Sequence, residues 1–272
     1  MSNSILVELS ERMPGSHEIL SSVGLAQSMA ASDVIEHAHE RGLRHLVQRN
    51  GLAFDQELAA SKAMIESPNL FFKDPLSVIF GKSENKAPQA TAFFNKRYDV
   101  TEKKSAVLDE FSKYLSGLAK VARIWDQALL VADELYTNGI KNAWTPRKAG
   151  EKLFEGQPEL NGHVDFFAHS ENGRLAIGCQ DSFGRLEMTT VLTRIMLCYK
   201  NGVANSIRRG NGGAGIGSYM VFESCVSYYV AVEPGVSSVV CVVLPIGISL
   251  SQAADLPKNI HLLSYTSKGG SL

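Results

Sequence analysis

The spacing of apolar residues divides the chain into a helical first part and a mixed second part. Between about residues 16 and 64, apolar side chains such as Val34, Ala38 and Leu43 recur near the helical period. Proline and polar clusters over residues 67–98 predict loops or a linker. We therefore predict a mainly helical N-terminal region at residues 1–90, a second domain at 91–248 and a polar C-terminal tail at 249–272.

The second part of the chain predicts helices that alternate with pairs of strands. The expected order is a strand at 93–100, helices at 102–118 and 118–143, strands at 163–169 and 174–180, helices at 187–199 and 219–224, and strands at 227–233 and 236–244. Ser170–Gly173 is a hairpin signal between the second and third strands. This order predicts an α+β fold in which helices cover one face of a mixed sheet.

The composition indicates a cytoplasmic globular protein. Among 272 residues, 27 basic and 28 acidic side chains nearly cancel, which gives no electrostatic case for nucleic acid or an anionic membrane as partner. The longest apolar run, residues 239–248, is far shorter than the ~20 residues of a membrane-spanning helix. The N-terminus lacks the pattern of a secretory signal. The cysteines stand singly among apolar neighbours, without zinc-ligand spacing, and predict reduced core thiols: Cys179, Cys198, Cys225 and Cys241.

Three histidines occur in the first part of the chain, at His37, His39 and His45. His39 is followed by Glu40, which is the minimal pattern of a phospho-accepting histidine on a helix. Solvent-facing histidines on a charged helix face are the favoured interpretation, and no nearby carboxylate or thiolate pattern supports a metal site.

The long helix predicted at 118–143 carries a polar group of interest. Glu134 and Asn138 are four residues apart, so they lie on one face, with Lys141 and Asn142 a turn further along. A carboxylate and a carboxamide at this spacing offer oxygen ligands for a hard cation and a candidate general base. A solvated face of an amphipathic helix would give the same pattern, and for this segment alone that is the favoured interpretation.

A glycine-rich segment precedes the helix predicted at 219–224. Glycines at the start of a helix let backbone N–H groups approach a phosphate closely. Residues 210–215 match GxGxxG, and Glu233 follows eighteen residues later, as in a dinucleotide-binding fingerprint. That fingerprint needs a buried strand directly before the glycines, whereas residues 205–210 are polar, so it is kept as a minor alternative.

Three segments in this order resemble the motifs of the GHKL superfamily, which includes histidine kinases, anti-sigma-factor serine kinases and gyrase-type topoisomerases. Residues 134–143, ELYTNGIKNA, resemble the N box, and residues 181–184, DSFG, resemble the aspartate box. Residues 213–218, GAGIGS, resemble the second glycine box, and the strand that ends at Pro245 resembles the last strand of the family. Order and spacing agree over about residues 100–247.

The resemblance implies a two-layer α/β sandwich that binds ATP or ADP with Mg²⁺. Asn138 would hold Mg²⁺, Glu134 would polarise the attacking group, and Asp181 would accept a hydrogen bond from the adenine amino group. Backbone amides of the glycine box would hold the phosphates, and residues 186–212 would form the ATP lid. The residues assigned to the nucleotide are Asn138, Lys141, Asp181, Phe183, Gly184, Arg208, Arg209, Gly213, Gly215, Ile216 and Gly217.

The sequence departs from the family pattern at several positions. Gly139 and Asn142 replace the usual alanine and histidine of the N box, and Phe183 and Arg185 replace glycines of the aspartate box. Phe183 could stack beside adenine or fill its site, so binding is expected more than efficient turnover.

Two functions are consistent with this resemblance. One is an ATP-dependent kinase-like regulator that phosphorylates or sequesters a protein partner, as anti-sigma kinases do. The alternative is a degenerate, non-catalytic module that senses nucleotide or binds a partner. In either case the N-terminal region would serve docking or homodimerisation.

Overall fold

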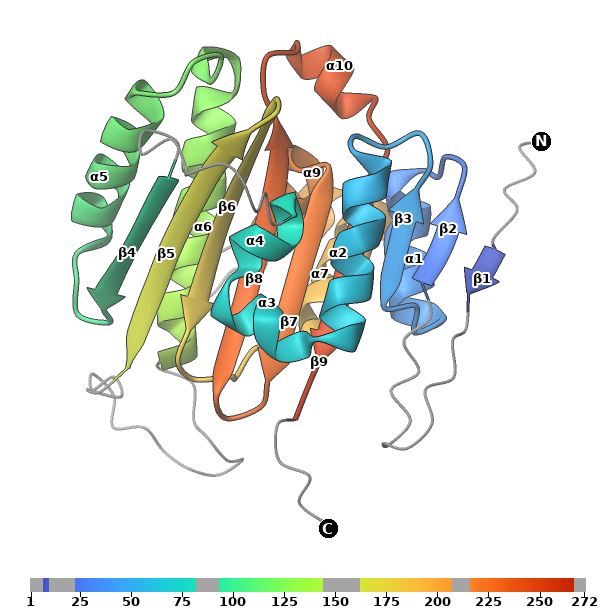
Figure 1. Ribbon diagram of the computed structural model, residues 1–272, viewed down its shortest axis with the longest axis horizontal. Coiled ribbons are helices and arrows are strands. Elements are labelled where there is room, and N and C mark those ends of the chain that lie inside the picture. Colours follow the sequence, from blue (N-terminus) through green and yellow to red (C-terminus); the bar gives the residue numbers. More distant parts are fainter. Residues whose placement is uncertain (1–6, 10–22, 82–92, 144–161, 207–215, 267–272) are drawn as a thin grey trace.

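The computed structural model describes residues 7–9, 23–81, 93–143, 162–206 and 216–266. Within them, one nine-stranded mixed sheet runs in the order β1-β2-β3-β9-β7-β8-β6-β5-β4 (Figure 1). Its strands are β1 (Val7–Leu9), β2 (Val23–Ala26), β3 (His45–Gln48), β4 (Phe93–Asp99), β5 (His163–Glu171), β6 (Arg174–Asp181), β7 (Ser227–Glu233), β8 (Ser237–Pro245) and β9 (Asn259–Ser264).

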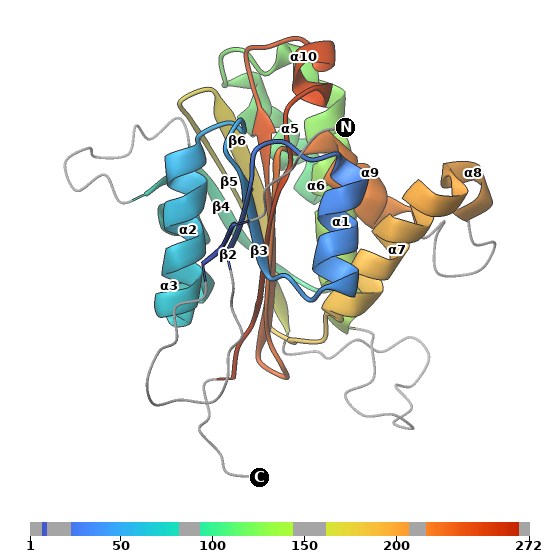
Figure 2. The same cartoon turned by 90° about the vertical axis from the view of Figure 1, so that its right-hand side faces the viewer.

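Helices lie on both faces of the sheet, which Figure 2 shows nearly edge-on. One face is covered by α1 (Ala31–Glu40), α5 (Lys104–Ser116), α6 (Trp125–Ala143), α7 (Met188–Asn201) and α9 (Gly217–Ser224). The other is covered by α2 (Phe54–Glu66), α3 (Pro68–Lys73) and α4 (Pro75–Phe80). The short segments η2 (Ala122–Ile124), α8 (Val203–Ser206) and α10 (Leu250–Ala254) complete the described helices. The predicted α+β class with a mixed sheet is confirmed. The long helices predicted in the second part of the chain lie on one face, and α2, α3 and α4 of the N-terminal region add helices to the other.

The elements predicted for the second part of the chain are present within two residues of their expected bounds, except that the helix predicted at 118–143 begins at Trp125, after the short segment η2. The β5–β6 hairpin closes through Asn172 and Gly173, both with positive φ, at 50° and 75°. Two consecutive positive φ values are typical of a tight hairpin turn, and Asn-Gly tolerates them best. This turn fixes the register that brings Asp181 to the end of β6.

The structure corrects the predicted division of the chain. The N-terminal region contributes strands as well as helices, because β2 and β3 pair with each other and β3 pairs with β9. All four residues of β2 and of β3 are buried, and such short runs lack the alternation that distinguishes a strand from a buried helical segment. Residues 259–264, predicted as part of a tail, form β9 between β3 and β7.

A buried polar network joins α2 to the sheet, and it explains why β9 was not predicted as a strand from the sequence. The carboxylate of Glu57 on α2 accepts hydrogen bonds from the Tyr229 hydroxyl (2.5 Å) and from Nε2 of His261 on β9 (3.0 Å). Nδ1 of His261 lies 3.0 Å from the hydroxyl of Ser61 on α2. Because β9 points polar residues into the protein interior, its sequence lacks the apolar pattern of a central strand.

His45 also departs from the expectation of a solvent-facing side chain. It is fully buried on β3, and burial, helped by the charges of His261 and Arg44, holds the pKa of its imidazole well below the usual value. A neutral imidazole at this place is consistent with a structural residue. The four cysteines are buried free thiols, as predicted. No helix in the described part of the chain is long and apolar enough to cross a bilayer.

Candidate functional site

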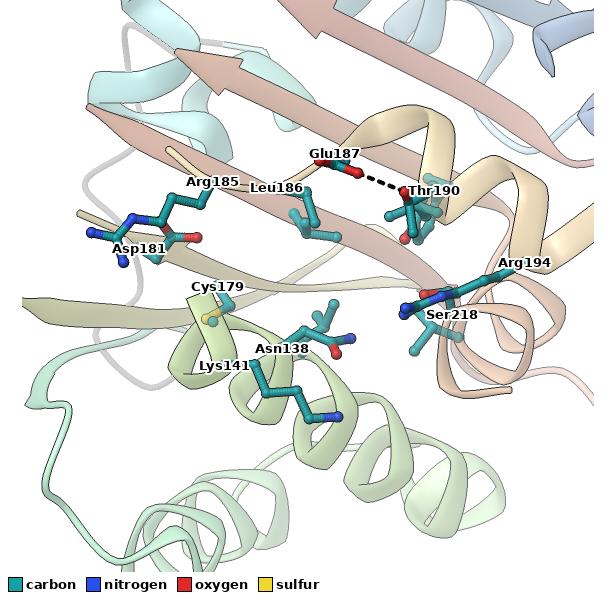
Figure 3. A pocket seen from close by; sticks show the side chains of 16 residues that line it. Asn138, Lys141, Cys179, Asp181, Arg185, Leu186, Glu187, Thr190, Arg194 and Ser218 are labelled. Atoms are coloured by element: carbon teal, nitrogen blue, oxygen red, sulfur yellow. Dashed lines mark hydrogen bonds between the residues drawn. The ribbon is translucent and has the colours of Figure 1, made fainter. Parts of the chain in front are cut away.

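A pocket of about 330 Å³ opens between α6, the end of β6, α7 and the start of α9. Helix α6 contributes Asn138 and Lys141, and β6 contributes Asp181. Figure 3 shows these side chains around a common space, with α7 along the opposite wall. The pocket therefore joins residues from two of the segments that the sequence singled out, the helix at 125–143 and the turn after β6.

The floor of the pocket is apolar. It is lined by Leu135, Cys179, Val221, Tyr228 and Val240. Burial, together with the nearby carboxylates of Asp181 and Asp165, raises the pKa of the Cys179 thiol well above its usual value. The thiol is therefore protonated at neutral pH, and this wall offers an uncharged surface to a flat or apolar group.

Asp181 is fixed by the turn that follows β6. Its Oδ1 accepts hydrogen bonds from the backbone N–H groups of Phe183 (2.8 Å) and Gly184 (3.0 Å). The side chain thus holds the chain reversal at the pocket entrance. Gly184 has φ of 60°, and a Cβ there would overlap the carbonyl of Glu233 in the β7–β8 turn. Gly184 is therefore required for packing against that turn and does not line the pocket.

Phe183 points away from the pocket. It is buried in a small cluster with Val100 and Ile140, and its ring packs so tightly on Gly162 that a Cβ there would overlap it. The guanidinium of Arg185 lies 5.3 Å from the centre of the Phe183 ring. Arg185 lines the pocket and Phe183 does not, so the aromatic ring leaves the pocket open.

Glu134 lies against the start of α9. A Cβ at Gly217 would overlap its carboxylate, so a larger residue at this position would require the Glu134 side chain to move. Burial, and secondarily the charge of Asp133, raise the pKa of Glu134, while Lys141 and Lys104 oppose the shift. A carboxylate with a raised pKa accepts a proton more readily at neutral pH than an ordinary glutamate does.

The described residues contain no group of three or more His, Cys, Asp or Glu side chains that could hold a metal ion. The carboxamide of Asn138 is half-buried and lines the pocket. Mg²⁺ commonly takes one or two protein oxygens and completes its shell with water and phosphate oxygens. Asn138 therefore fits a magnesium ion that arrives with a phosphorylated ligand, and does not fit a resident ion held by protein alone.

The sequence-predicted residues separate into three groups. Asn138, Lys141 and Asp181 meet in one pocket. Glu134 and Gly217 lie against each other and do not line it, although Ser218, the neighbour of Gly217, does. Ile216 directly precedes α9 as its N-cap residue. Outside the described residues lie Arg208, Arg209, Gly213, Gly215 and the alternative dinucleotide segment at 210–215.

Sequence reasoning missed the contribution of α7. Glu187, Thr190 and Arg194 all line the pocket, together with Ser218 of α9. The three residues follow one another at intervals of three and four, which places them on one helix face. This spacing is present in the sequence of the helix predicted at 187–199, but no sequence feature indicated which face of that helix would line a site.

No protein-family model matches the chain, and no curated protein matches it in sequence. The resemblance to GHKL domains therefore remains a prediction from motifs. The pocket geometry is the observation against which its assignments can be weighed.

Proposed function

We propose that the pocket binds ATP or ADP with Mg²⁺, and that the protein is an ATP-binding regulator of the GHKL type. The observation that supports the proposal best is that Asn138 and Asp181 line one pocket, although they come from separate motifs. According to the resemblance, Asn138 would bind the metal and Asp181 would bind the adenine. The apolar floor at Leu135 and Val221 suits a purine ring between them.

The proposed roles follow from the chemistry of each side chain. Asn138 would contribute one oxygen to Mg²⁺, which supplies charge neutralisation at the phosphates when bound. Asp181 would accept a hydrogen bond from the adenine amino group. Glu134 would take the proton of an attacking hydroxyl as the oxygen–phosphorus bond forms and the bond to ADP breaks. Its raised pKa suits this task.

The acceptor in this proposal is a protein partner or water. We infer a partner that is phosphorylated or sequestered, with the protein acting in the cytoplasm. The N-terminal region stays the candidate for docking or homodimerisation. Since its strands belong to the common sheet, deleting residues 1–90 would remove strands next to β9, so this idea is best tested on the full chain by measuring its mass in solution.

A non-catalytic module is a second candidate, and one observation favours it. Arg185 occupies a position where the aspartate box has glycine, and its long side chain lines the pocket. A bulky cation at this place takes space beside the nucleotide. Nucleotide binding without turnover would support this candidate over a kinase.

Calorimetric titration with ATP and ADP, with and without Mg²⁺, tests the proposal. Wild type is compared with Asn138→Ala and with Asn95→Ala, an exposed asparagine on the edge strand β4 that does not line the pocket. We expect magnesium-dependent binding that Asn138→Ala loses and Asn95→Ala keeps. Absence of binding by the wild type would exclude a nucleotide site. Where the nucleotide binds, phosphate release or transfer would distinguish an enzyme from a sensor.

A further inference from the structure

Arg194 projects from the wall of the pocket that α7 forms. It follows Glu187 by seven residues and Thr190 by four, and all three side chains line the pocket. Residues at this spacing share one helix face. The buried residues Val191 and Ile195 on the neighbouring face pack into the core and hold the helix in place. Arg194 is therefore carried by a fixed element and aimed at the pocket by its position on the helix.

The two ends of the pocket differ in charge. Figure 3 shows Asp181 and Arg185 at one end and Arg194 close to Ser218 at the other, with Asn138 between them. The Asp181 end carries opposite charges, the carboxylate of Asp181 and the guanidinium of Arg185, and offers a hydrogen-bond acceptor at a turn that Oδ1 of Asp181 stabilises. The Arg194 end offers a guanidinium and the hydroxyl of Ser218. A ligand that spans the pocket would then have a neutral, donor-bearing end and an anionic end.

Arg194 has no structural task in the described part of the chain. Its guanidinium makes no hydrogen bond or ion pair with a described residue, and its side chain is exposed. The nearest acid on its own helix face, Glu187, accepts a hydrogen bond from the Thr190 hydroxyl at 2.8 Å. By contrast, Lys200 on the same helix pairs with Glu40 of α1 at 3.0 Å. Arg194 is therefore available to a ligand.

We propose that Arg194 binds the phosphate chain of the nucleotide and makes the pocket selective for nucleoside polyphosphates over nucleosides. This inference rests on the proposed function. A guanidinium binds two phosphate oxygens through parallel N–H donors, which adds geometric selectivity to charge attraction. A nucleoside has no anionic group and gains nothing from Arg194. Arg194 thus supplies, from a described helix, a charge that the sequence assigned to Arg208 and Arg209.

The test compares Arg194→Met and Arg194→Lys with Arg123→Met, a variant of an exposed arginine in η2. Each is titrated with Mg-ATP, Mg-ADP and adenosine. We expect Arg194→Met to weaken ATP and ADP binding roughly 10- to 100-fold, the range for a lost charge-assisted pair. Arg194→Lys should retain part of the affinity, and adenosine binding should be unchanged in every variant. Arg123→Met should bind all three ligands as the wild type does.

The outcomes separate this inference from the proposed function. Wild-type affinity for ATP in Arg194→Met, or an equal loss for ATP and adenosine, would overturn the role of Arg194 and leave the nucleotide site standing. No ATP binding by the wild type would overturn both. Circular dichroism of each variant shows that α7 is intact, which is expected because Arg194 lies on an exposed face.

Discussion

Gly139 and Cys179 lie in such close contact that a methyl group on Gly139 would be 2.7 Å from the Cys179 sulfur. This contact joins α6 to β6 beneath the pocket. It gives a packing reason for glycine at position 139, because the Cys179 thiol occupies the space that an alanine methyl would need.

This contact predicts coupled effects on stability. Gly139→Ala gains up to about 1 kcal/mol of helix propensity, but overpacking a buried site costs about 1–3 kcal/mol. We expect a net loss in the wild-type background. In a Cys179→Ala background the methyl has room, and the same substitution should stabilise the protein. Urea denaturation of the wild type, both single variants and the double variant measures the coupling, expected at about 0.5–3 kcal/mol. Simple additivity would contradict the contact.

Glu134 should make stability depend on pH. Its pKa is raised in the folded protein, so folding favours the protonated form. The favourable contribution is complete below the ordinary value of 4.5 and is lost as pH rises through the folded-state pKa. Glu134→Gln should therefore be more stable than the wild type at neutral pH, with the difference shrinking in acid. Thermal unfolding between about pH 4 and pH 8 checks this.

The control for that experiment is Glu102→Gln, which removes an exposed carboxylate near the start of α5. A matching gain in the control would assign the effect to net charge. Under the proposed function, Glu134→Gln should also abolish phosphate release while leaving nucleotide binding intact, because the side chain acts on the attacking group.

Lys258 should stabilise α9 and through it the pocket. Its Nζ donates hydrogen bonds to the backbone carbonyls of Phe222 (3.1 Å), Glu223 (2.8 Å) and Cys225 (2.8 Å). A cation at a helix C-terminus satisfies carbonyls that have no partner in the helix. Lys258→Met keeps the aliphatic part and removes these bonds, and should lower the free energy of unfolding by about 3 kcal/mol.

Lys62→Met, at an exposed lysine of α2, is the matched control and should change stability by less than about 0.5 kcal/mol. Denaturant unfolding measures both variants. Since Ser218 and Val221 of α9 line the pocket, Lys258→Met should also weaken ligand binding. An unchanged unfolding midpoint would show that the ammonium is dispensable.

The sequence predicted the second part of the fold well because its helices are amphipathic and its strands are bounded by clear turns. It predicted the first part and the C-terminal segment poorly, because β2, β3 and β9 are short and buried on both faces. Their hydrophobic pattern does not alternate, and the buried polar residues Asn259 and His261 make β9 resemble a surface segment. Only contacts between distant segments, such as Glu57 with His261, reveal these strands.

For the site, the motifs located Asn138 and Asp181, whose roles depend on local spacing, and both line the pocket. They did not locate Arg194, which reaches the pocket only through the packing of α7, and they gave no role to Ser218, the last residue of the segment at 213–218. Phe183 could not be placed from sequence, since its direction depends on the space left by Gly162, a residue distant in the chain.

Asp181 stabilises the turn after β6 and, under the proposed function, would also bind adenine; a pair of variants distinguishes these two tasks. Its Oδ1 accepts two backbone hydrogen bonds, so Asp181→Ala should destabilise the protein by about 2 kcal/mol. Asp181→Asn retains an oxygen acceptor for the same amides and should keep nearly wild-type stability. Under the proposed function both variants should lose at least roughly tenfold in ATP affinity. Alanine has no acceptor for the adenine amino group, and the carboxamide of asparagine can turn its N–H donors toward that group, which is itself a donor. Asp181→Asn with full stability and full ATP affinity would confine Asp181 to the turn and leave adenine recognition to other residues.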